Sequence, residues 1–410
     1  MSIPKLDLEF VRAQFPAFSE PSLKGWAFFE NAGGSYPCRQ TVDRLHDFYT
    51  KTKVQPYGPY PAATTGGRLM DDAYVRLAGA MNVGSDEVHI GPSTSQNTYV
   101  LAHAFRQIWD DGDEIIVTNQ DHEANSGVWR RLVDTGITVR EWKVDPVTGM
   151  LDPADLAALF TDKTRLVAFP HVSNIIGHNN PVTEICASIT AAGAVSVVDG
   201  VSAAPHGLPD VSSLGADIYL FSAYKTWGPH QGVMTVKSAV CNSLPNQSHY
   251  FNDSYATKRL VPAGPDHAQV AALNGVVDYI DAVHEAHFDD GALPSERAQR
   301  VHDLFRNTET ELLAPLLDSL RDNPKARLLG PDDAVTRVPT VALHTERNPA
   351  EIAAELAEHK IAADASNFYA VRVLEAMGVP LDPGVLRVSF VHYTSPEEVA
   401  RLSEALATAL

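Results

Sequence analysis

Short apolar runs alternate with amphipathic segments through the central part of the chain. The runs are rich in β-branched and aromatic side chains, which is typical of buried strands. They cover residues 114–118 (EIIVT), 165–169 (RLVAF), 194–198 (AVSVV) and 218–221 (IYLF). Residues 153–160 and 182–192, which lie between runs, have apolar positions at helical spacing. This alternation predicts an α/β fold with a mainly parallel sheet sandwiched by helices.

Punctuating residues and a change of pattern suggest where elements and domains end. Asp152 before Pro153 predicts a helix start, and Gly193 predicts a helix end. Residues 264–284 have the pattern of one long helix. After about Gly291 we expect a smaller α+β lobe, with a helix through Leu320, strands near 338–343 and 385–391, and helices near 350–359 and 396–410. We therefore divide the chain into an N-terminal segment of the small lobe (1–25), a large domain (26–290) and a C-terminal small domain (291–410).

Composition narrows the class of protein. The 410 residues are 44% hydrophobic and 20% charged, which suits a soluble globular protein with a sizeable core. A formal net charge of −19 argues against nucleic acid and anionic membrane surfaces as partners. We find no apolar run long enough for a membrane span, and the first residues lack a signal-peptide pattern. Cys38, Cys186 and Cys241 have no paired spacing, so we expect reduced thiols in a cytoplasm and no zinc site.

Two polar residues follow predicted strands where ligands bind in open α/β sheets. Asp199 ends the run VVD. An acid at this position has three alternative interpretations: it binds a ribose hydroxyl, it pairs with a protonated pyridine nitrogen, or it only caps a turn. The ribose interpretation needs an upstream Gly-x-Gly-x-x-Gly turn, which the sequence lacks. Lys225, in FSAYKTWGP, follows the next strand. Alone it is most simply a structural lysine, but with Asp199 it forms the pair required by a pyridoxal 5'-phosphate (PLP) enzyme, an imine-forming amine and an acid.

Three further segments carry candidate chemistry, each with a plain structural alternative. His122 in DHEAN follows a strand, where an imidazole can stack on a ring and move protons, or serve only in packing. Asn174 in HVSN has an amide for a phenolate oxygen, or is a turn residue. The stretch GPSTSQNT, with Thr94 and Ser95, begins a helix and forms a phosphate cup or an ordinary helix cap. Arg387, inside an apolar strand, needs a carboxylate from either the protein or a substrate.

Taken in order, these motifs resemble the class V aminotransferase group of fold-type I PLP enzymes, in particular its cysteine desulfurase-like branch. The motifs are FENAGG, DHEAN, HVSN, VDGV, SAYK and RVSFVHY. The resemblance implies that Lys225 holds PLP as a Schiff base and that His122 stacks on the ring. It further implies binding of the cofactor by Asp199, Asn174, Ser202, Ser222, Tyr224, Thr94 and Ser95, and of the substrate carboxylate by Arg387 and Asn31. A homodimer with the site at the subunit interface is implied as well.

Departures from the family pattern bear on the reaction. We align Tyr369 with the nucleophilic cysteine of desulfurases, and no cysteine follows Cys241. Tyr224 stands where desulfurases have a phosphate-binding histidine, Ser202 replaces a glutamine, and the threonine that crosses the dimer falls near Pro265. Cys186 is interpreted as a core residue.

We therefore expect an enzyme that acts on a small amino acid through an α-carbanion, with Lys225 as the base. β-Elimination without persulfide formation, as in a C–S lyase, is the favoured outcome. A class V aminotransferase is the first alternative. A protein of the same fold that binds a ligand without turnover is the second.

Overall fold

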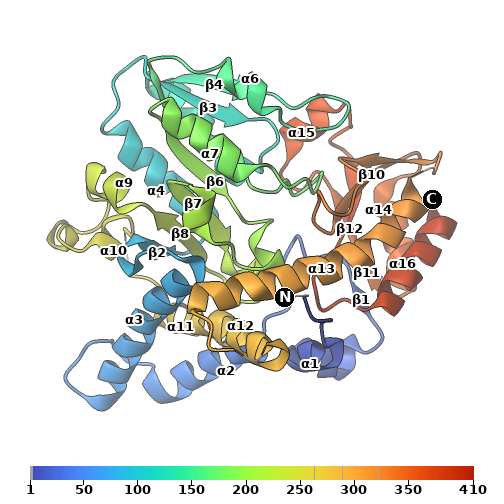
Figure 1. Cartoon of the computed structure of the whole chain (residues 1–410), viewed down its shortest axis with the longest axis horizontal. Helices are drawn as coiled ribbons and strands as arrows, with labels where there is room; N and C mark the ends of the chain where they lie inside the picture. Colours follow the sequence, from blue (N-terminus) through green and yellow to red (C-terminus); the bar gives the residue numbers. More distant parts are fainter. Residues whose placement is uncertain (1–2, 263, 289, 322) are drawn as a thin grey trace.

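A seven-stranded sheet forms the centre of the computed structural model, which describes residues 3–262, 264–288, 290–321 and 323–410 (Figure 1). Strand β8 is antiparallel to both of its neighbours, β7 and β2, and the remaining pairs are parallel. In spatial order the strands are β2 (Val88–Gly91), β8 (Gly232–Val236), β7 (Ile218–Ser222), β6 (Val195–Asp199), β5 (Thr164–Pro170), β3 (Glu114–Thr118) and β4 (Thr138–Trp142). The predicted α/β class with a mainly parallel sheet is confirmed.

Helices cover both faces of this sheet because alternate strand residues point in opposite directions. Ile116 belongs to one buried cluster, whereas its neighbours Ile115 and Val117 belong to another. The first cluster packs against helices α3, α7 and α12, and the second against α4 and α5. Their bounds are α3 (Pro61–Met81), α4 (Thr94–Arg106), α5 (Glu123–Arg130), α7 (Val182–Ala191) and α12 (Asn274–His287).

The remaining helices of the first 290 residues are shorter. They are α1 (Leu8–Ala13), α2 (Arg39–Asp47), α6 (Pro153–Ala157), α8 (Val211–Leu214), α9 (Ser238–Ser243), α10 (Ala256–Arg259) and α11 (His267–Ala272). No helix in the described ranges combines the length and apolar character needed to cross a bilayer.

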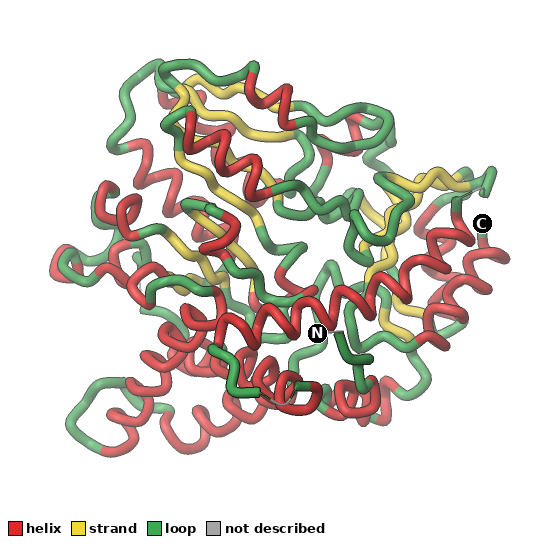
Figure 2. Tube along the Cα trace, in the orientation of Figure 1, coloured by secondary structure: helices red, strands yellow, loops and turns green. Residues whose placement is uncertain are grey.

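A second, antiparallel sheet of four strands lies apart from the first (Figure 2). Its order is β12 (Asp364–Ser366), β13 (Val385–Ser389), β10 (Thr340–Thr345) and β9 (Ala326–Leu329). The helices of this region are α14 (Pro349–Glu358), α15 (Val371–Ala376) and α16 (Pro396–Ala409). Strands β1 (Ala27–Phe28) and β11 (Ile361–Ala362) pair in parallel beside it, so the start of the chain is joined to this region.

Helix α13 (Pro294–Leu320) connects the two regions and is 27 residues long (Figure 1). Val301, Leu304 and Phe305 belong to the larger core, whereas the residues from Leu312 to Leu320 pack into the smaller one. Pro315 lies inside the helix.

The four predicted central strands are confirmed to within one residue at each end. Three element predictions were wrong in extent. The helix expected at 153–160 ends at Ala157, and the strand expected through residue 391 ends at Ser389, because Phe390 donates its N–H to Pro339 instead. The helix expected at 264–284 is two helices, α11 and α12.

The domain boundaries stay a prediction. Within the segment assigned to the small lobe, Leu6, Val11 and Phe15 pack with the larger core.

Candidate active site

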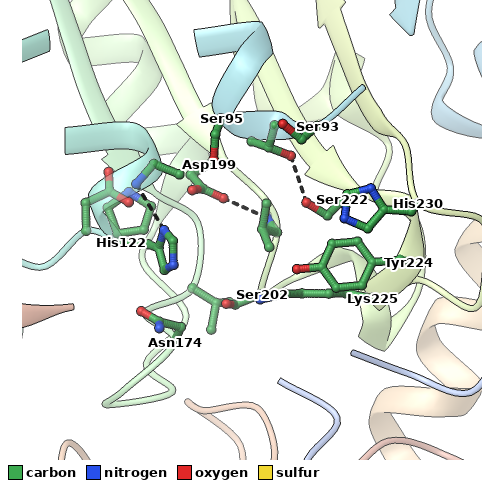
Figure 3. A pocket seen from close by; sticks show the side chains of 16 residues that line it. Ser93, Ser95, His122, Asn174, Asp199, Ser202, Ser222, Tyr224, Lys225 and His230 are labelled. Atoms are coloured by element: carbon green, nitrogen blue, oxygen red, sulfur yellow. Dashed lines mark hydrogen bonds between the residues drawn. The ribbon is translucent and has the colours of Figure 1, made fainter. Parts of the chain in front are cut away.

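Two adjoining cavities lie beyond the carboxyl ends of the central strands. The inner cavity measures about 190 Å³ and the outer one about 680 Å³. Lys225, His122, Asn174, Tyr224 and Ser95 line both. Figure 3 shows Asp199 and His122 on one side of the inner cavity, with Ser222, Tyr224 and His230 on the other. The structure therefore gathers residues from distant parts of the chain at the edge predicted for ligand binding.

Lys225 follows β7 directly, at the end of a short 3-10 turn, and is 8% exposed. Burial, together with the charge of Arg387, lowers the pKa of Lys225 to about 8. In the described part of the chain, no group forms a hydrogen bond with its Nζ. The side chain is therefore an amine that is partly neutral near pH 8 and free to react.

Asp199 ends β6 next to the strand that carries Lys225, and it is 4% exposed. Its Oδ1 accepts a hydrogen bond of 2.8 Å from the backbone N–H of Val201. Burial raises the pKa of Asp199 to about 6. Asp121 lines the same cavity, and burial and the charge of Asp199 raise its pKa well above the ordinary value. The cavity floor thus has two acids that favour a cationic or hydrogen-donating partner.

His122 caps the start of α5, where its Nδ1 accepts a 3.0 Å hydrogen bond from the backbone N–H of Ala124. Burial, with the charges of Lys225 and Arg387, lowers the pKa of His122 to about 3. The ring is therefore neutral, with its proton on Nε2. The ring of Tyr369 lies beside it at a centroid distance of 5.6 Å and is tilted by 47°, so the two rings are not stacked.

Hydroxyl groups surround the N-terminus of α4 at the far end of the inner cavity. Ser93 caps the helix, and the Oγ1 of Thr94 lies 2.8 Å from the Oγ of Ser222. A Cβ at Gly232 would lie 2.4 Å from the backbone nitrogen of Thr94, so only glycine lets β8 approach this turn. The helix N-terminus and the hydroxyl groups together suit an anion such as phosphate.

Tyr224 and Ser202 complete the walls of the inner cavity. The ring of Tyr224 is stacked on that of His230 at 4.8 Å, with an interplanar angle of 12°. In the family pattern, Tyr224 stands where desulfurases have a phosphate-binding histidine. Here His230 lies beside Tyr224, but it comes from the loop before β8.

Arg387 enters from β13 of the second sheet and is 3% exposed. Its Nη2 lies 3.2 Å from Oε1 of Glu30, and its Nη1 donates to the carbonyl oxygen of Asn174 at 3.3 Å. The guanidinium lies 3.6 Å from the ring centre of Phe368. Burial lowers the pKa of Arg387 to about 10.

Asn31, expected to bind the substrate carboxylate, forms hydrogen bonds within the protein. Its amide nitrogen donates to the carbonyl oxygens of Phe28 and Ser389, and its oxygen accepts from the Tyr393 hydroxyl. Both amide hydrogens of Asn31 are thus used within the protein, and its role towards the substrate stays a prediction.

The loop that carries Tyr369 is held at two points. Asn174 donates its amide to the carbonyl oxygen of Phe368 at 3.0 Å, and the N–H of Glu123 donates to that of Tyr369 at 2.9 Å. Phe368 and Tyr369 both have positive φ angles, 49° and 56°, a strained pair typical of functional loops. Tyr369 is 72% exposed and lines the outer cavity.

The three cysteines lie elsewhere. All are buried, and none lines either cavity. Burial raises the pKa of Cys38 and Cys186 to about 11, so both are protonated thiols at neutral pH.

Comparison with known proteins identifies the family. The Aminotransferase class-V family matches residues 27–286. The chain belongs to this family. An aminotransferase-like protein of Gibberella zeae is 32% identical over 418 residues, covering 99% of each chain. A cysteine desulfurase of Serratia proteamaculans is 27% identical, covering 99% of this chain and 98% of its own. The fold matches the apo structure of a cysteine desulfurase from Thermococcus onnurineus, with a TM-score of 0.85 at 21% identity, over 100% and 99% of the two chains.

Class V aminotransferases and cysteine desulfurases use PLP, and this chain is a PLP-dependent enzyme of that family. Its site fits the cofactor on three observations. Lys225 has an unbonded, buried amine, the hydroxyl cup suits a phosphate, and Oδ1 of Asn174 is buried without a partner in the described residues. Asp199 lies on the side of the cavity opposite the cup residue Ser222 (Figure 3).

Sequence reasoning missed four residues of the site. Asp121 and Ser93 each precede a predicted residue, and His230 follows Lys225 within the same glycine-rich loop, so proximity in sequence was an available signal. Glu30 adjoins Asn31, but no local pattern indicates that it contacts Arg387.

Proposed function

We propose that Lys225 binds PLP covalently and that the enzyme eliminates a β-substituent from a small amino acid. The observation that carries this is the buried, unbonded amine of Lys225 with Asp199 on the adjacent strand end. When bound, the cofactor supplies an electron sink for the pair left at Cα after its proton is removed.

Each residue of the site binds a different part of the cofactor, according to its position in the cavity. Asp199 holds a positive charge at the ring nitrogen, because a carboxylate in a buried site stabilises a cation. Ser93, Thr94, Ser95 and Ser222 bind the phosphate at the start of α4. Tyr224 and Ser202 border the phosphate and ring oxygens. The amide nitrogen of Asn174 donates one hydrogen to Phe368 and has a second hydrogen for the phenolate oxygen.

Arg387 orients the substrate through its α-carboxylate, which needs a bidentate partner at a buried guanidinium. Lys225, once displaced, takes the α-proton on Nζ, since a pKa of about 8 leaves a useful fraction of neutral amine. His122, which is neutral and lines the inner cavity, would cover one face of the bound cofactor and exclude water from it. Tyr369 borders the entrance beside the β-substituent.

Elimination without persulfide is favoured by the position of the thiols. A persulfide needs a cysteine at the substrate, and none of the three cysteines lines either cavity. Transamination is the second candidate, favoured by the 32% identity with a protein described as aminotransferase-like. We also propose a homodimer with the site at its interface, consistent with the exposed aromatic side chains of Tyr250, Phe251 and Tyr255.

Borohydride reduction of the PLP-loaded protein followed by peptide mapping tests the proposal. We expect the label on Lys225 and its loss in Lys225→Ala, whereas the half-exposed Lys237 serves as the control in Lys237→Ala. Incubation with cysteine and related amino acids then distinguishes the reactions. Catalytic pyruvate and ammonia support elimination, and stoichiometric pyridoxamine phosphate that requires a keto acid for turnover supports transamination. An unlabelled Lys225 would refute the proposal.

A further inference from the structure

The buried cation expected to hold the substrate carboxylate already has a carboxylate partner. Arg387 is 3% exposed, and Glu30 Oε1 lies 3.2 Å from its Nη2. Glu30 also lines the outer cavity together with Lys225, so its carboxylate borders the space that a substrate side chain enters. Glu30 thus faces the same cavity as the two groups that an amino acid would contact, Lys225 and Arg387.

The local fold builds this pair. Glu30 forms a parallel bridge with Ser389, two residues after Arg387, and the N–H of Ala32 donates to the Ser389 hydroxyl at 2.8 Å. A Cβ at Gly33 would lie 2.1 Å from Oε1 of Glu30. Glycine at 33 therefore gives the carboxylate the room to fold back towards Arg387.

The charges of Arg387 and Glu30 determine which charge a substrate side chain must carry. If the substrate carboxylate takes Arg387, Glu30 loses its cation in a site where an unpaired carboxylate is costly. Among the described residues, two other cations line the outer cavity, Arg131 and Lys225. Arg131 donates to the Tyr99 hydroxyl at 2.7 Å, and Lys225 is committed to the cofactor under the proposed function.

A positive group on the substrate side chain restores the balance. We propose that Glu30 binds the side-chain ammonium or guanidinium of a basic α-amino acid while Arg387 binds its α-carboxylate. This inference rests on the proposed function, because it assumes that the substrate amine reaches the cofactor at Lys225. It names basic amino acids as the substrate class of the site.

Absorbance titration of the PLP-loaded enzyme with L-lysine and L-norleucine tests the inference, since the two differ by the terminal ammonium. We expect the wild-type enzyme to bind lysine about tenfold more tightly, a difference of about 1.4 kcal/mol. Glu30→Gln should reduce the ratio of the two dissociation constants to about one. Glu123→Gln removes a charge from the same cavity without touching the pair, and should preserve the ratio.

Gly33→Ala provides an independent variant, because the added methyl displaces the Glu30 carboxylate and should lower the preference. Equal binding of both probes by the wild-type enzyme overturns the inference, as does a preference that persists in Glu30→Gln. Cadaverine, which lacks the carboxylate, should bind more weakly than lysine; equal binding overturns the role of Arg387. If the amino acids change the spectrum but lysine is not preferred over norleucine, only the role of Glu30 is overturned. If no probe changes the spectrum and Lys225 is unlabelled, the proposed function is overturned as well.

Discussion

The amine of Lys225 should be far more reactive at neutral pH than an ordinary lysine. Burial and Arg387 lower its pKa from 10.5 to about 8. Near pH 7, such an amine is neutral in about one molecule in ten, whereas an ordinary lysine is neutral in fewer than about one in a thousand. The structure therefore predicts a reactive fraction about 300 times larger, equivalent to about 3 kcal/mol.

Two substitutions should move this pKa in opposite directions. Arg387 disfavours a charged amine, so Arg387→Leu should raise the pKa of Lys225. Asp199 favours the charged amine, so Asp199→Asn should lower the pKa further. Because only the neutral amine attacks an aldehyde, the pH profile of the reaction moves up in the first variant and down in the second.

The assay is the rate at which PLP labels the cofactor-free protein at Lys225, measured by borohydride quenching and mass spectrometry between about pH 6 and pH 10. The protonation of the reagent itself is common to all proteins, so it cancels in comparisons between variants. A wild-type midpoint near 10.5, or a downward shift in Arg387→Leu, would show that the reasoning about burial is wrong.

Three further predictions concern the cup and the sheet. Ser222→Ala should weaken PLP binding about tenfold by removing a hydrogen bond to a charged phosphate, yet leave pyridoxal binding unchanged in parallel titrations. Gly232→Ala should destabilise the fold by about 1–3 kcal/mol, because the added Cβ overlaps the turn before α4, and an unchanged urea midpoint would contradict this. Burial lowers the pKa of His89 from 6.5 to about 4. As the pH falls, the unfolded state therefore binds a proton at His89 before the folded state does, and the free energy of unfolding decreases between pH 6.5 and about pH 4. His89→Leu should reduce that slope by up to about 1.4 kcal/mol per pH unit in urea unfolding, and an equal slope would count against it.

The strand-end residues of the site were predictable from sequence. An apolar run followed by a polar residue locates the carboxyl end of a parallel strand, and such ends meet at one edge of the sheet. His122 and Lys225 follow β3 and β7 in this way, Asp199 is the last residue of β6, and all three line the inner cavity. Their roles towards PLP remain proposals.

Features that depend on tertiary contacts were not predictable. Arg387 was known to need a carboxylate, but the contact with Glu30 spans 357 residues and depends on the bridge to Ser389. The break between α11 and α12 has a similar cause. Asn274 donates its side-chain amide to the carbonyl oxygens of Ala271 and Leu69, which ties the junction to α3 and competes with regular helix bonds.

Helix α13 lacks one internal hydrogen bond close to the boundary between the two cores. Pro315 has no N–H to give to the carbonyl oxygen of Glu311, immediately before the smaller core begins at Leu312. Helix α13, which both cores share, therefore lacks a backbone hydrogen bond where the two cores meet. Lys225 follows a strand of one sheet and Arg387 lies in the other, so this helix joins the two parts of the chain that together supply the site.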